Sequence, residues 1–189
     1  MKMTHRQGGF TVIELMIVLT VAAVILSVAV PTFETIVKNN RLYTQSNDFY
    51  LSLMRARSEA LARVQRVTVC PANSGFSNCS GTTWENGWIV FVEDFASQNG
   101  SVDAGEDIIL VQQTLSGSNT LRGSNNVASY VSYLGDGLTT TMAPAPQTGI
   151  FVLCDDRGIS EGKGIRLNAS GRPLVVDAAT DAGITNCSP

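Results

Sequence analysis

The chain has 189 residues, of which 44 % are hydrophobic and 15 % are charged, and its formal net charge is −3 at pH 7. This composition excludes an intrinsically disordered chain, and the length allows one compact domain of ordinary size behind an N-terminal segment. The acidic net charge disfavours nucleic acid as a general partner. The charge is uneven: residues 31–66 carry six basic and three acidic groups, whereas residues 67–189 carry five basic and twelve acidic groups.

A long apolar run begins close to the N-terminus. Residues 10–30 are 21 residues with a single charge, and a helix of that length, at about 1.5 Å per residue, spans roughly 31 Å. The hydrocarbon core of a bilayer is about 30 Å thick, so the run is long enough to cross it. Lys2 and Arg6 precede the run. The positive-inside rule therefore predicts a cytoplasmic leader and a head on the outer side of the membrane.

Three interpretations of this run compete. A secretory signal would be cut after the small-x-small stretch Ser27-Val28-Ala29, and a signal anchor would stay uncut. Neither explains Glu14, since a carboxylate in hydrocarbon costs about 2.5–3.5 kcal/mol on insertion scales. Cleavage after Gly9 explains it better. Phe10 then gains a free amine, Glu14 becomes the fifth residue of the mature chain, and an opposite charge from a neighbouring copy of the segment offsets its cost.

The residues GGFTVIELMIVLTVAAVILSVAVP resemble the N-terminus of type IV pilins and of the pseudopilins of type II secretion. The resemblance implies that a prepilin peptidase removes the leader, residues 1–9, between Gly9 and Phe10 and methylates the new N-terminus to N-methylphenylalanine. It also implies that Glu14 aids docking of the subunit into the growing fibre. Residues 10–30 would then form a helix that lies first in the membrane and later in the fibre core.

Residues 31–66 are predicted to continue as an amphipathic helix. Pro31 is expected to kink or pause the helix because proline lacks an N–H donor. An apolar stripe with helical spacing follows, made of Leu42, Phe49, Leu53, Ala56, Ala60 and Val64. The arginines of this segment are interpreted as a solvated or snorkelling face and not as a binding patch. The helix should end near Gln65, where β-branched residues begin a strand.

Residues 67–189 are predicted to form a β-rich globular head. Short β-branched or aromatic runs bounded by turn residues lie at 67–69, 88–92, 108–111, 131–134, 149–153, 164–167 and 174–176. Because no helical pattern separates them, an antiparallel sheet is expected, with 164–167 pairing with 174–176 across a tight turn. Residues 139–148 are predicted to form an exposed loop.

Four cysteines behind an export-type N-terminus favour disulfides over a metal site, particularly as no CxxC spacing is present and the only histidine, His5, lies in the leader. Four cysteines allow three connectivities. Cys70 and Cys79 flank a short turn-forming loop whose closure costs little entropy. Cys154 ends a predicted strand, and Cys187 lies near a C-terminus that needs to be held. The favoured pairs are therefore Cys70–Cys79 and Cys154–Cys187.

The acidic stretch VEDFASQNGSVDAGED invites comparison with a calcium-binding loop. With Asp94 as the first position of an EF-hand, the third is Ala96 and the sixth is Asn99, where the loop requires glycine. The stretch is therefore interpreted as a hairpin loop, and no metal or other cofactor is expected. An enzyme is not expected either, because a mature chain without histidine cannot form a Ser-His-Asp or Cys-His arrangement.

The sequence that follows the apolar run strengthens the resemblance. The strings MRARSEALARVQRVTVCP, CPANSGFSNC, TWENGWIVFVEDF and GIFVLCDDRGISEGKGIRLNASGR, in this order, are similar to the GspH/FimT family of minor pilins and pseudopilins. The family implies an α+β type IV pilin fold, in which a long N-terminal helix packs on an antiparallel β-sheet head. In some members a Gly-Arg-x-Arg stretch takes up DNA. Here Gly171-Arg172-Pro173-Leu174 lacks the second arginine, so Arg172 is a weak candidate for a DNA contact.

These expectations combine into one hypothesis. The chain is a minor pilin that is anchored in the inner membrane by one helix with its head in the periplasm, is processed by the prepilin peptidase, and assembles with other pilin or pseudopilin subunits into a type IV pilus. The first alternative is a pseudopilin H of type II secretion, in a periplasmic pseudopilus that exports proteins. The second alternative is a minor pilin that binds DNA for natural transformation.

Overall fold

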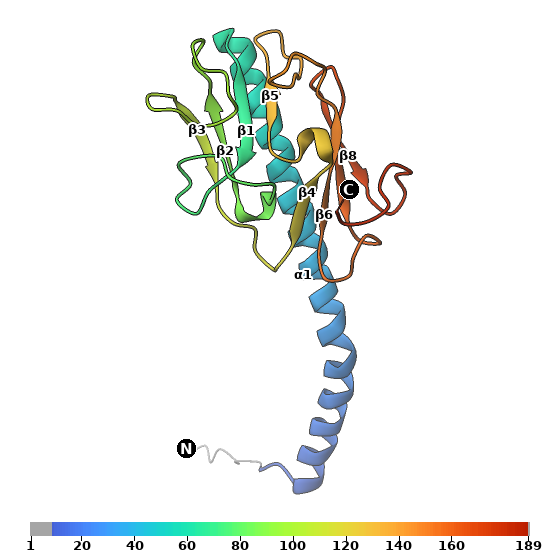
Figure 1. The fold of residues 1–189 in the computed structure, drawn as a ribbon. Helices are drawn as coiled ribbons and strands as arrows, with labels where there is room; N and C mark the ends of the chain where they lie inside the picture. Colours follow the sequence, from blue (N-terminus) through green and yellow to red (C-terminus); the bar gives the residue numbers. More distant parts are fainter. Residues whose placement is uncertain (1–8, 189) are drawn as a thin grey trace, which may run out of the picture. The chain divides into compact units, whose positions relative to one another are not determined.

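A computed structural model of the chain describes residues 9–188. Residues 1–8 of the predicted leader, including Lys2, His5 and Arg6, lie outside this range. The chain divides into two compact units, residues 1–38 and residues 39–189, which are described separately. The first unit holds the apolar start of the helix α1, and the second holds the remainder of α1 and all eight strands (Figure 1).

The helix α1 runs from Val12 to Arg63 in 52 residues without interruption. The pause expected at Pro31 is absent, because the helix continues through this residue. It ends two residues before the predicted end at Gln65. Val64 adopts a left-handed conformation with φ of 53°, and the N–H of Gln65 donates to the carbonyl of Ala60 at 3.3 Å. This left-handed residue with a returning hydrogen bond is a common way to stop a helix, although glycine usually occupies the position.

The strands of the head form two four-stranded sheets. The order of the first sheet is β3-β2-β1-β5, and the order of the second is β4-β6-β7-β8. All pairs of neighbouring strands are antiparallel, as the sequence predicted, but they are divided between two sheets where one was expected. The strands are β1 (Val67–Pro71), β2 (Trp88–Val92), β3 (Ile108–Gln112), β4 (Thr120–Gly123), β5 (Val131–Tyr133), β6 (Gly149–Cys154), β7 (Lys163–Leu167) and β8 (Pro173–Asp177).

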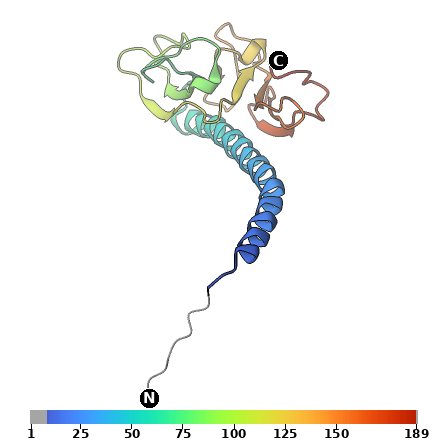
Figure 2. The same cartoon turned by 90° about the horizontal axis from the view of Figure 1, so that it is seen from below.

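Both sheets cover the head portion of α1. Seen from below, the green strands and the orange strands lie side by side over the cyan part of the helix (Figure 2). Two short 3-10 helices, η1 (Trp84–Asn86) and η2 (Asn125–Val127), connect the strands. The predicted hairpin between residues 164–167 and 174–176 is confirmed, since Leu167 pairs with Pro173 and Ile165 pairs with Val175.

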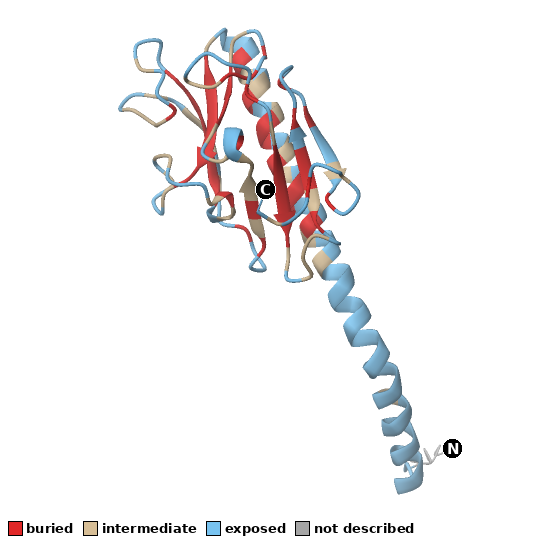
Figure 3. Ribbon diagram, turned by 45° about the vertical axis from the view of Figure 1, so that its right-hand side comes forward, coloured by how far each residue is buried: buried red, intermediate tan, exposed pale blue. Residues whose placement is uncertain are grey.

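The core of the head lies between α1 and the two sheets, where the buried residues concentrate (Figure 3). The predicted apolar stripe is confirmed at five positions, which are Leu42, Phe49, Leu53, Ala56 and Ala60. It is wrong at Val64, which is 71 % exposed because the left-handed turn directs it away from the core. Phe49 of α1 makes edge-to-face contacts with the rings of Trp84, Trp88 and Phe151 at 4.7–5.3 Å between centroids.

Each sheet also has an apolar cluster on the face that does not meet α1, and a disulfide holds each cluster closed. On the first sheet, Ile89 and Phe91 pack with Cys70, which is bonded to Cys79. On the second sheet, Ile150, Val152 and Ile184 pack with Cys154, which is bonded to Cys187. Both predicted pairings are present in the structure. The second disulfide fastens the C-terminal tail over the outer face of its sheet, so that this small cluster is shielded from water.

Candidate functional site: the N-terminal segment

Thr11 begins the helix by capping it. Its side-chain oxygen accepts a hydrogen bond from the backbone N–H of Glu14 at 3.2 Å, and its carbonyl accepts one from Leu15 at 3.1 Å. A threonine followed three residues later by glutamate is the sequence signature of a capping box, in which the side chains satisfy free N–H groups of the first turn. The carboxylate of Glu14 also lies at the positive end of the helix dipole, where negative charge is favoured. The sequence pattern T-V-I-E carried this signal, but the prediction overlooked it.

The first part of α1 is exposed on all sides. An 18-residue window of the helix has a mean hydropathy of 2.7, and none of it is buried within the structure. Its hydroxyl groups are satisfied by the helix itself. Thr20 donates to the carbonyl of Ile17, Ser27 donates to the carbonyl of Val24, and Thr32 donates to the carbonyl of Val28. Because these polar groups need no water, the segment presents to its surroundings a surface that hydrocarbon or another apolar helix can accept.

The predicted cleavage position lies just before this helix. Gly9 and Phe10 are outside any helix or strand, and both are exposed. Among the described residues, and leaving aside its own chain neighbour Phe10, no atom lies within 4 Å of the place where a Cβ on Gly9 would stand. The Gly9–Phe10 peptide bond therefore precedes the helix, whereas the peptide bonds from Val12 onward are held in the ladder of α1.

Comparison with known families identifies the class of protein. The model of the family described as "Type II transport protein GspH" matches residues 45–171, which is more than half of the chain. The chain belongs to the GspH family. The model described as "Prokaryotic N-terminal methylation motif" matches residues 4–30, the segment that contains Gly9, Phe10 and Glu14. The chain is therefore a type IV pilin-like protein of the GspH/FimT kind, and this family consists of structural subunits and not of enzymes.

The fold of this GspH-family protein is similar to that of the type IV minor pilin FimU from Pseudomonas aeruginosa strain PAO1 in two crystal forms. For the crystal in space group P21 the TM-score is 0.60 at 16 % identity, and 79 % of this chain and 97 % of that chain are covered. For the crystal in space group P65 the TM-score is 0.54 at 15 % identity, with 77 % and 99 % covered. The chain matches no curated protein. The structural likeness confirms the type IV pilin fold.

The candidate DNA contact, Arg172, lies on the surface in the turn before β8, and its backbone N–H donates to Asn168. Arg57 reaches the same turn, but its guanidinium donates to the carbonyls of Gly137 and Ser170. A basic groove that follows a phosphate backbone needs several free cations, because affinity grows with the number of phosphates neutralised. The geometry at Arg172 supplies no specific support for DNA binding.

The acidic loop between β2 and β3 closes through its own hydrogen bonds. The carboxylate of Glu106 accepts the N–H groups of Asp94 and Asp103, and the carboxylate of Asp103 accepts Ser97 and Asn99. Between residues 9 and 188, no group of three or more His, Cys, Asp or Glu side chains is arranged to hold a metal ion. The loop geometry matches the predicted hairpin, with its carboxylates used as local acceptors.

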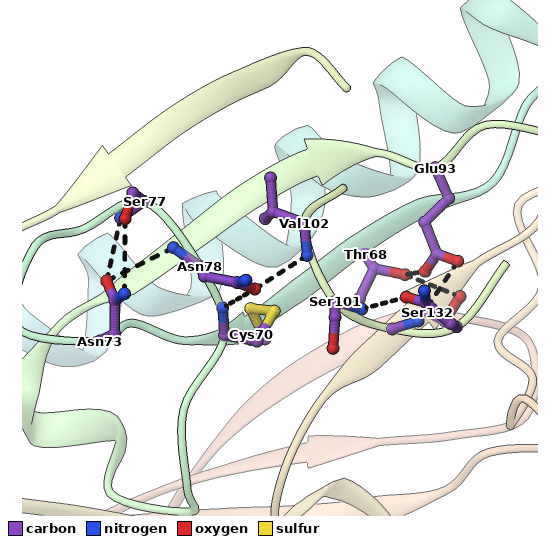
Figure 4. The surroundings of a disulfide bond; sticks show 12 residues. Thr68, Cys70, Asn73, Ser77, Asn78, Glu93, Ser101, Val102 and Ser132 are labelled. Atoms are coloured by element: carbon purple, nitrogen blue, oxygen red, sulfur yellow. Dashed lines mark hydrogen bonds between the residues drawn. A yellow bond between two sulfur atoms is a disulfide. The ribbon is translucent and has the colours of Figure 1, made fainter. Parts of the chain in front are cut away.

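Glu93, at the start of this loop, is a buried carboxylate that the sequence did not single out. It is 1 % exposed and lies beside Thr68 and Ser132 (Figure 4). The hydroxyl of Thr68 donates to it, and the N–H of Gly100 donates to it at 3.5 Å. Burial raises the pKa of Glu93, although the hydrogen bonds and the positive charge of Arg66 act against this shift. Glu93 thereby ties the acidic loop to β1.

The same loop is also tied to the first disulfide. The side-chain oxygen of Asn78 accepts hydrogen bonds from the backbone N–H of Cys79 at 2.7 Å and of Val102 at 3.0 Å (Figure 4). The disulfide loop and the acidic loop therefore form one connected surface over the outer face of the first sheet. Neither loop has a sequence motif that would have revealed this contact, since it joins residues 24 positions apart.

Proposed function

We propose that the chain is a minor pilin subunit of a type IV pilus. In this proposal the leader is cut between Gly9 and Phe10, Phe10 is methylated, and residues 10–30 anchor the subunit in the inner membrane with the head in the periplasm. The observation that carries the proposal is the apolar, fully exposed first part of α1, with Glu14 in its opening turn. The likeness to a protein described as a type IV minor pilin supports it.

The physical argument concerns where such a helix can be stable. Residues 10–30 include 17 apolar residues, and exposing them to water is unfavourable at about 25 cal/mol per Å² of surface. A bilayer removes this cost before assembly, and a bundle of equivalent helices from other subunits removes it afterwards. Glu14 is the exception in that surface, and the free amine of a processed Phe10 on a neighbouring subunit would neutralise it. The apolar helix and the single acid thus favour ordered assembly over simple anchoring.

A pseudopilin of type II secretion is the second candidate, and the description of the matching family favours it. A pseudopilin would use the same leader, the same apolar helix and the same acid. The two candidates differ in the fibre that the subunit enters and therefore in the phenotype of its loss. Deletion of the gene should abolish or reduce surface pili if the first proposal holds. If the deletion instead stops the secretion of enzymes and leaves the pili normal, the chain is a pseudopilin of type II secretion.

The processing step is tested by mass spectrometry of the mature subunit purified from membranes. The expected N-terminal peptide begins at Phe10 and carries one methyl group on its amine. A variant in which Gly9 is replaced by leucine should retain the leader, because the peptidase then meets a side chain where the glycine left open space. A mature protein that begins at Val30, where a signal peptidase would cut, would disprove both candidates.

A further inference from the structure

The last strand of the second sheet, β8, has an open edge. Leu174 is 54 % exposed and Val175 is 42 % exposed, although they are consecutive and therefore point to opposite faces of the sheet. The edges of two other strands are covered. Glu85 accepts the N–H of Leu121 on β4, and the N–H of Thr140 donates to Ser132 on β5. Among the strands of residues 9–188, β8 and β3 keep edges with large exposed apolar side chains, Val111 of β3 being 42 % exposed.

The free hydrogen-bonding groups of β8 follow from its pairing with β7. The N–H of Ala178 donates to Gly162, which lies on the β7 side. The backbone N–H and carbonyl groups of successive residues point alternately to the two sides of a strand. Those of Leu174 and Val176 therefore also point toward β7, whereas those of Val175 and Asp177 point outward. The carbonyl of Asp177 is already used, because it accepts the N–H groups of Thr180 and Asp181. The open groups are therefore the carbonyl of Pro173, the N–H and carbonyl of Val175 and the N–H of Asp177.

The same reasoning applies to β3. Ala72 continues β1, and its N–H donates to the carbonyl of Gly87, the residue before β2. The backbone groups of odd-numbered residues of β2 therefore point toward β1, and those of even-numbered residues point toward β3. Their partners Leu110 and Gln112 accordingly face β2. The N–H and carbonyl of Val111 then point outward, and so does the carbonyl of Ile109, because it lies opposite the inward N–H of Leu110 in the same peptide plane.

Both open strands run in the same direction along the head. The start of β3 lies near the end of α1, since Asp107 forms an ion pair with Arg63 at 3.0 Å. The start of β8 lies there too. Arg57 donates to Ser170, and Gly171 packs so closely on the carbonyl of Gly137 that a Cβ would stand 2.2 Å from it. At their other ends the two strands approach residues 39–48 of α1, where Gln112 and Lys163 line surface pockets with helix residues.

We propose that β8 of one copy pairs in parallel with β3 of a second, equally oriented copy. In this alignment the N–H and carbonyl of Val175 and the N–H of Asp177 all find partners, and the carbonyl of Pro173 remains at the end of the ladder. Val175 N–H would donate to the carbonyl of Ile109, Val111 N–H to the carbonyl of Val175, and Asp177 N–H to the carbonyl of Val111. This is the slanted pattern of a parallel ladder. The equal orientation of the copies rests on the proposed assembly into a fibre, in which all heads point the same way.

The charges at the ends of the strands fit the same alignment. Arg172, immediately before β8, would lie beside Glu106 and Asp107, which precede β3. In an antiparallel alignment Asp177 would instead approach these acids, and like charges would oppose each other. Pro173, which has no N–H, closes one end of the ladder, and the occupied carbonyl of Asp177 closes the other. The contact is heterologous, so it joins one copy to the next where two copies are neighbours in a fibre, and it does not close into a two-fold dimer.

Site-specific cross-linking tests this contact in cells that assemble the full-length chain. Two tagged copies are expressed together, one carrying Leu174→Cys and the other Val111→Cys, and are treated with a short bismaleimide. The native cysteines are all paired within residues 9–188, so the new thiols are the reactive ones. The two positions would lie diagonally on one face, about 7–8 Å apart. The control replaces Val111→Cys with Leu138→Cys, a loop position of similar exposure at 46 %.

The expected result is a product of twice the subunit mass, at least about fivefold stronger than the control, because the contact creates a high local concentration of the two thiols. Val175→Lys places a charge in the middle of the open edge, a device by which natural proteins block edge pairing, and should abolish the product. Arg172→Glu should reduce it about fivefold, and Arg172→Lys should preserve it. Both positions are exposed, so the fold should survive.

The outcomes separate this contact from the proposed function. If the chain enters fibres normally and the cross-link equals its control, or persists in the Val175→Lys variant, the pairing of β8 with β3 is wrong and the pilin assignment stands. If cross-links form only to a different pilin subunit, a second copy is not the partner and the proposal is overturned. If the chain enters no fibre at all, the proposed function fails first.

Discussion

The side-chain oxygen of Thr11 lies 3.2 Å from the backbone nitrogen of Glu14 and caps the first turn of α1. The carboxylate of Glu14, in this capped turn, has two expected roles that experiments must separate. As the third residue of the helix, its carboxylate stabilises the positive end of the helix dipole. As the one acid in an apolar surface, it is proposed to pair with the amine of a neighbouring processed subunit. The first role concerns the helix of one subunit, and the second concerns assembly.

Replacement of Glu14 by alanine should leave a membrane-inserted subunit with a folded head that enters fibres poorly. We expect incorporation to fall at least about tenfold, which corresponds to the loss of about 1.4 kcal/mol from one charge-assisted contact. Immunoblots of sheared fibres and of membranes measure the fraction assembled.

Thr11→Ala is the matched control for this prediction. It removes the cap, at a cost of about 1 kcal/mol to the first turn, but keeps the carboxylate. We expect it to assemble almost as well as the native subunit. Equal defects in the two variants would show that the start of the helix, and not the charge, governs assembly.

The two disulfides should contribute unequally to stability. The Cys154–Cys187 bond spans 33 residues and the Cys70–Cys79 bond spans 9. In the chain-entropy model these loops correspond to about 3.7 and 2.6 kcal/mol. Replacing Cys154 and Cys187 by serine should therefore lower the free energy of unfolding more, and should also loosen the tail, so that a dye specific for exposed apolar surface binds the folded protein. Urea denaturation of both double variants measures the order, and the reverse order would contradict it.

Some features of the head could be predicted because they depend on local patterns. The spacing of Leu42, Phe49 and Leu53 defines a helical face whatever the rest of the fold, and the short loop between Cys70 and Cys79 brings its own ends together. The signals for processing at Gly9 and Phe10 and for assembly through Glu14 are also contiguous in the sequence, and these roles remain predictions. The cap by Thr11 was not predicted, although its hydroxyl stands three residues before Glu14 in the same contiguous stretch.

Other features depend on contacts between distant residues and left no local signal. Alternation of apolar residues identifies strands but not the sheet to which each strand belongs. The division of the strands into two sheets could therefore not be predicted from the sequence. The strand β4 (Thr120–Gly123) has only four residues and one buried side chain, Leu121. Val64 fits the helical spacing, yet a left-handed backbone removes it from the core. Glu93 is buried only because Thr68 and Gly100, from other segments, supply donors.

The buried carboxyl of Glu93 should make stability depend on pH in a defined direction. Burial raises its pKa above the usual value of 4.5, so the folded state holds a proton that the unfolded state releases in the window above that value. This contribution is fully present below pH 4.5 and is lost as the pH rises through the higher pKa of the folded state. Glu93→Gln, which stays neutral, should therefore gain stability relative to the native protein between pH 4 and pH 7.

Thermal unfolding of both proteins across this range measures the difference, in which contributions from all other groups cancel. A variant that loses stability relative to the native protein as the pH rises would contradict the assigned cause, because it would mean that the ionised carboxylate is the form that the fold prefers.

The head should fold without the apolar part of the helix. Residues 39–189 form a compact unit that includes every core residue of α1. A fragment that starts at Asn39 should be soluble and should unfold cooperatively in oxidising buffer. A fragment that starts at Val67 lacks Leu42, Phe49 and Leu53 and should aggregate, because the inner faces of both sheets are then uncovered. Circular dichroism with thermal unfolding distinguishes the two outcomes, and a well-folded shorter fragment would place the boundary elsewhere.

Within that fragment, Phe49 should be the most sensitive position of α1. Its ring contacts Trp84 on η1, Trp88 on β2 and Phe151 on β6, so one side chain joins the helix to both sheets. Phe49→Ala leaves a cavity among rigid rings that cannot collapse to fill it, and should lower the free energy of unfolding by about 3–5 kcal/mol. Leu51→Ala, two residues further along the same helix but exposed to solvent, should change it by less than about 0.5 kcal/mol. Urea titrations of both variants in oxidising buffer give the comparison, and similar losses at the two positions would mean that the helix does not present the face described for it.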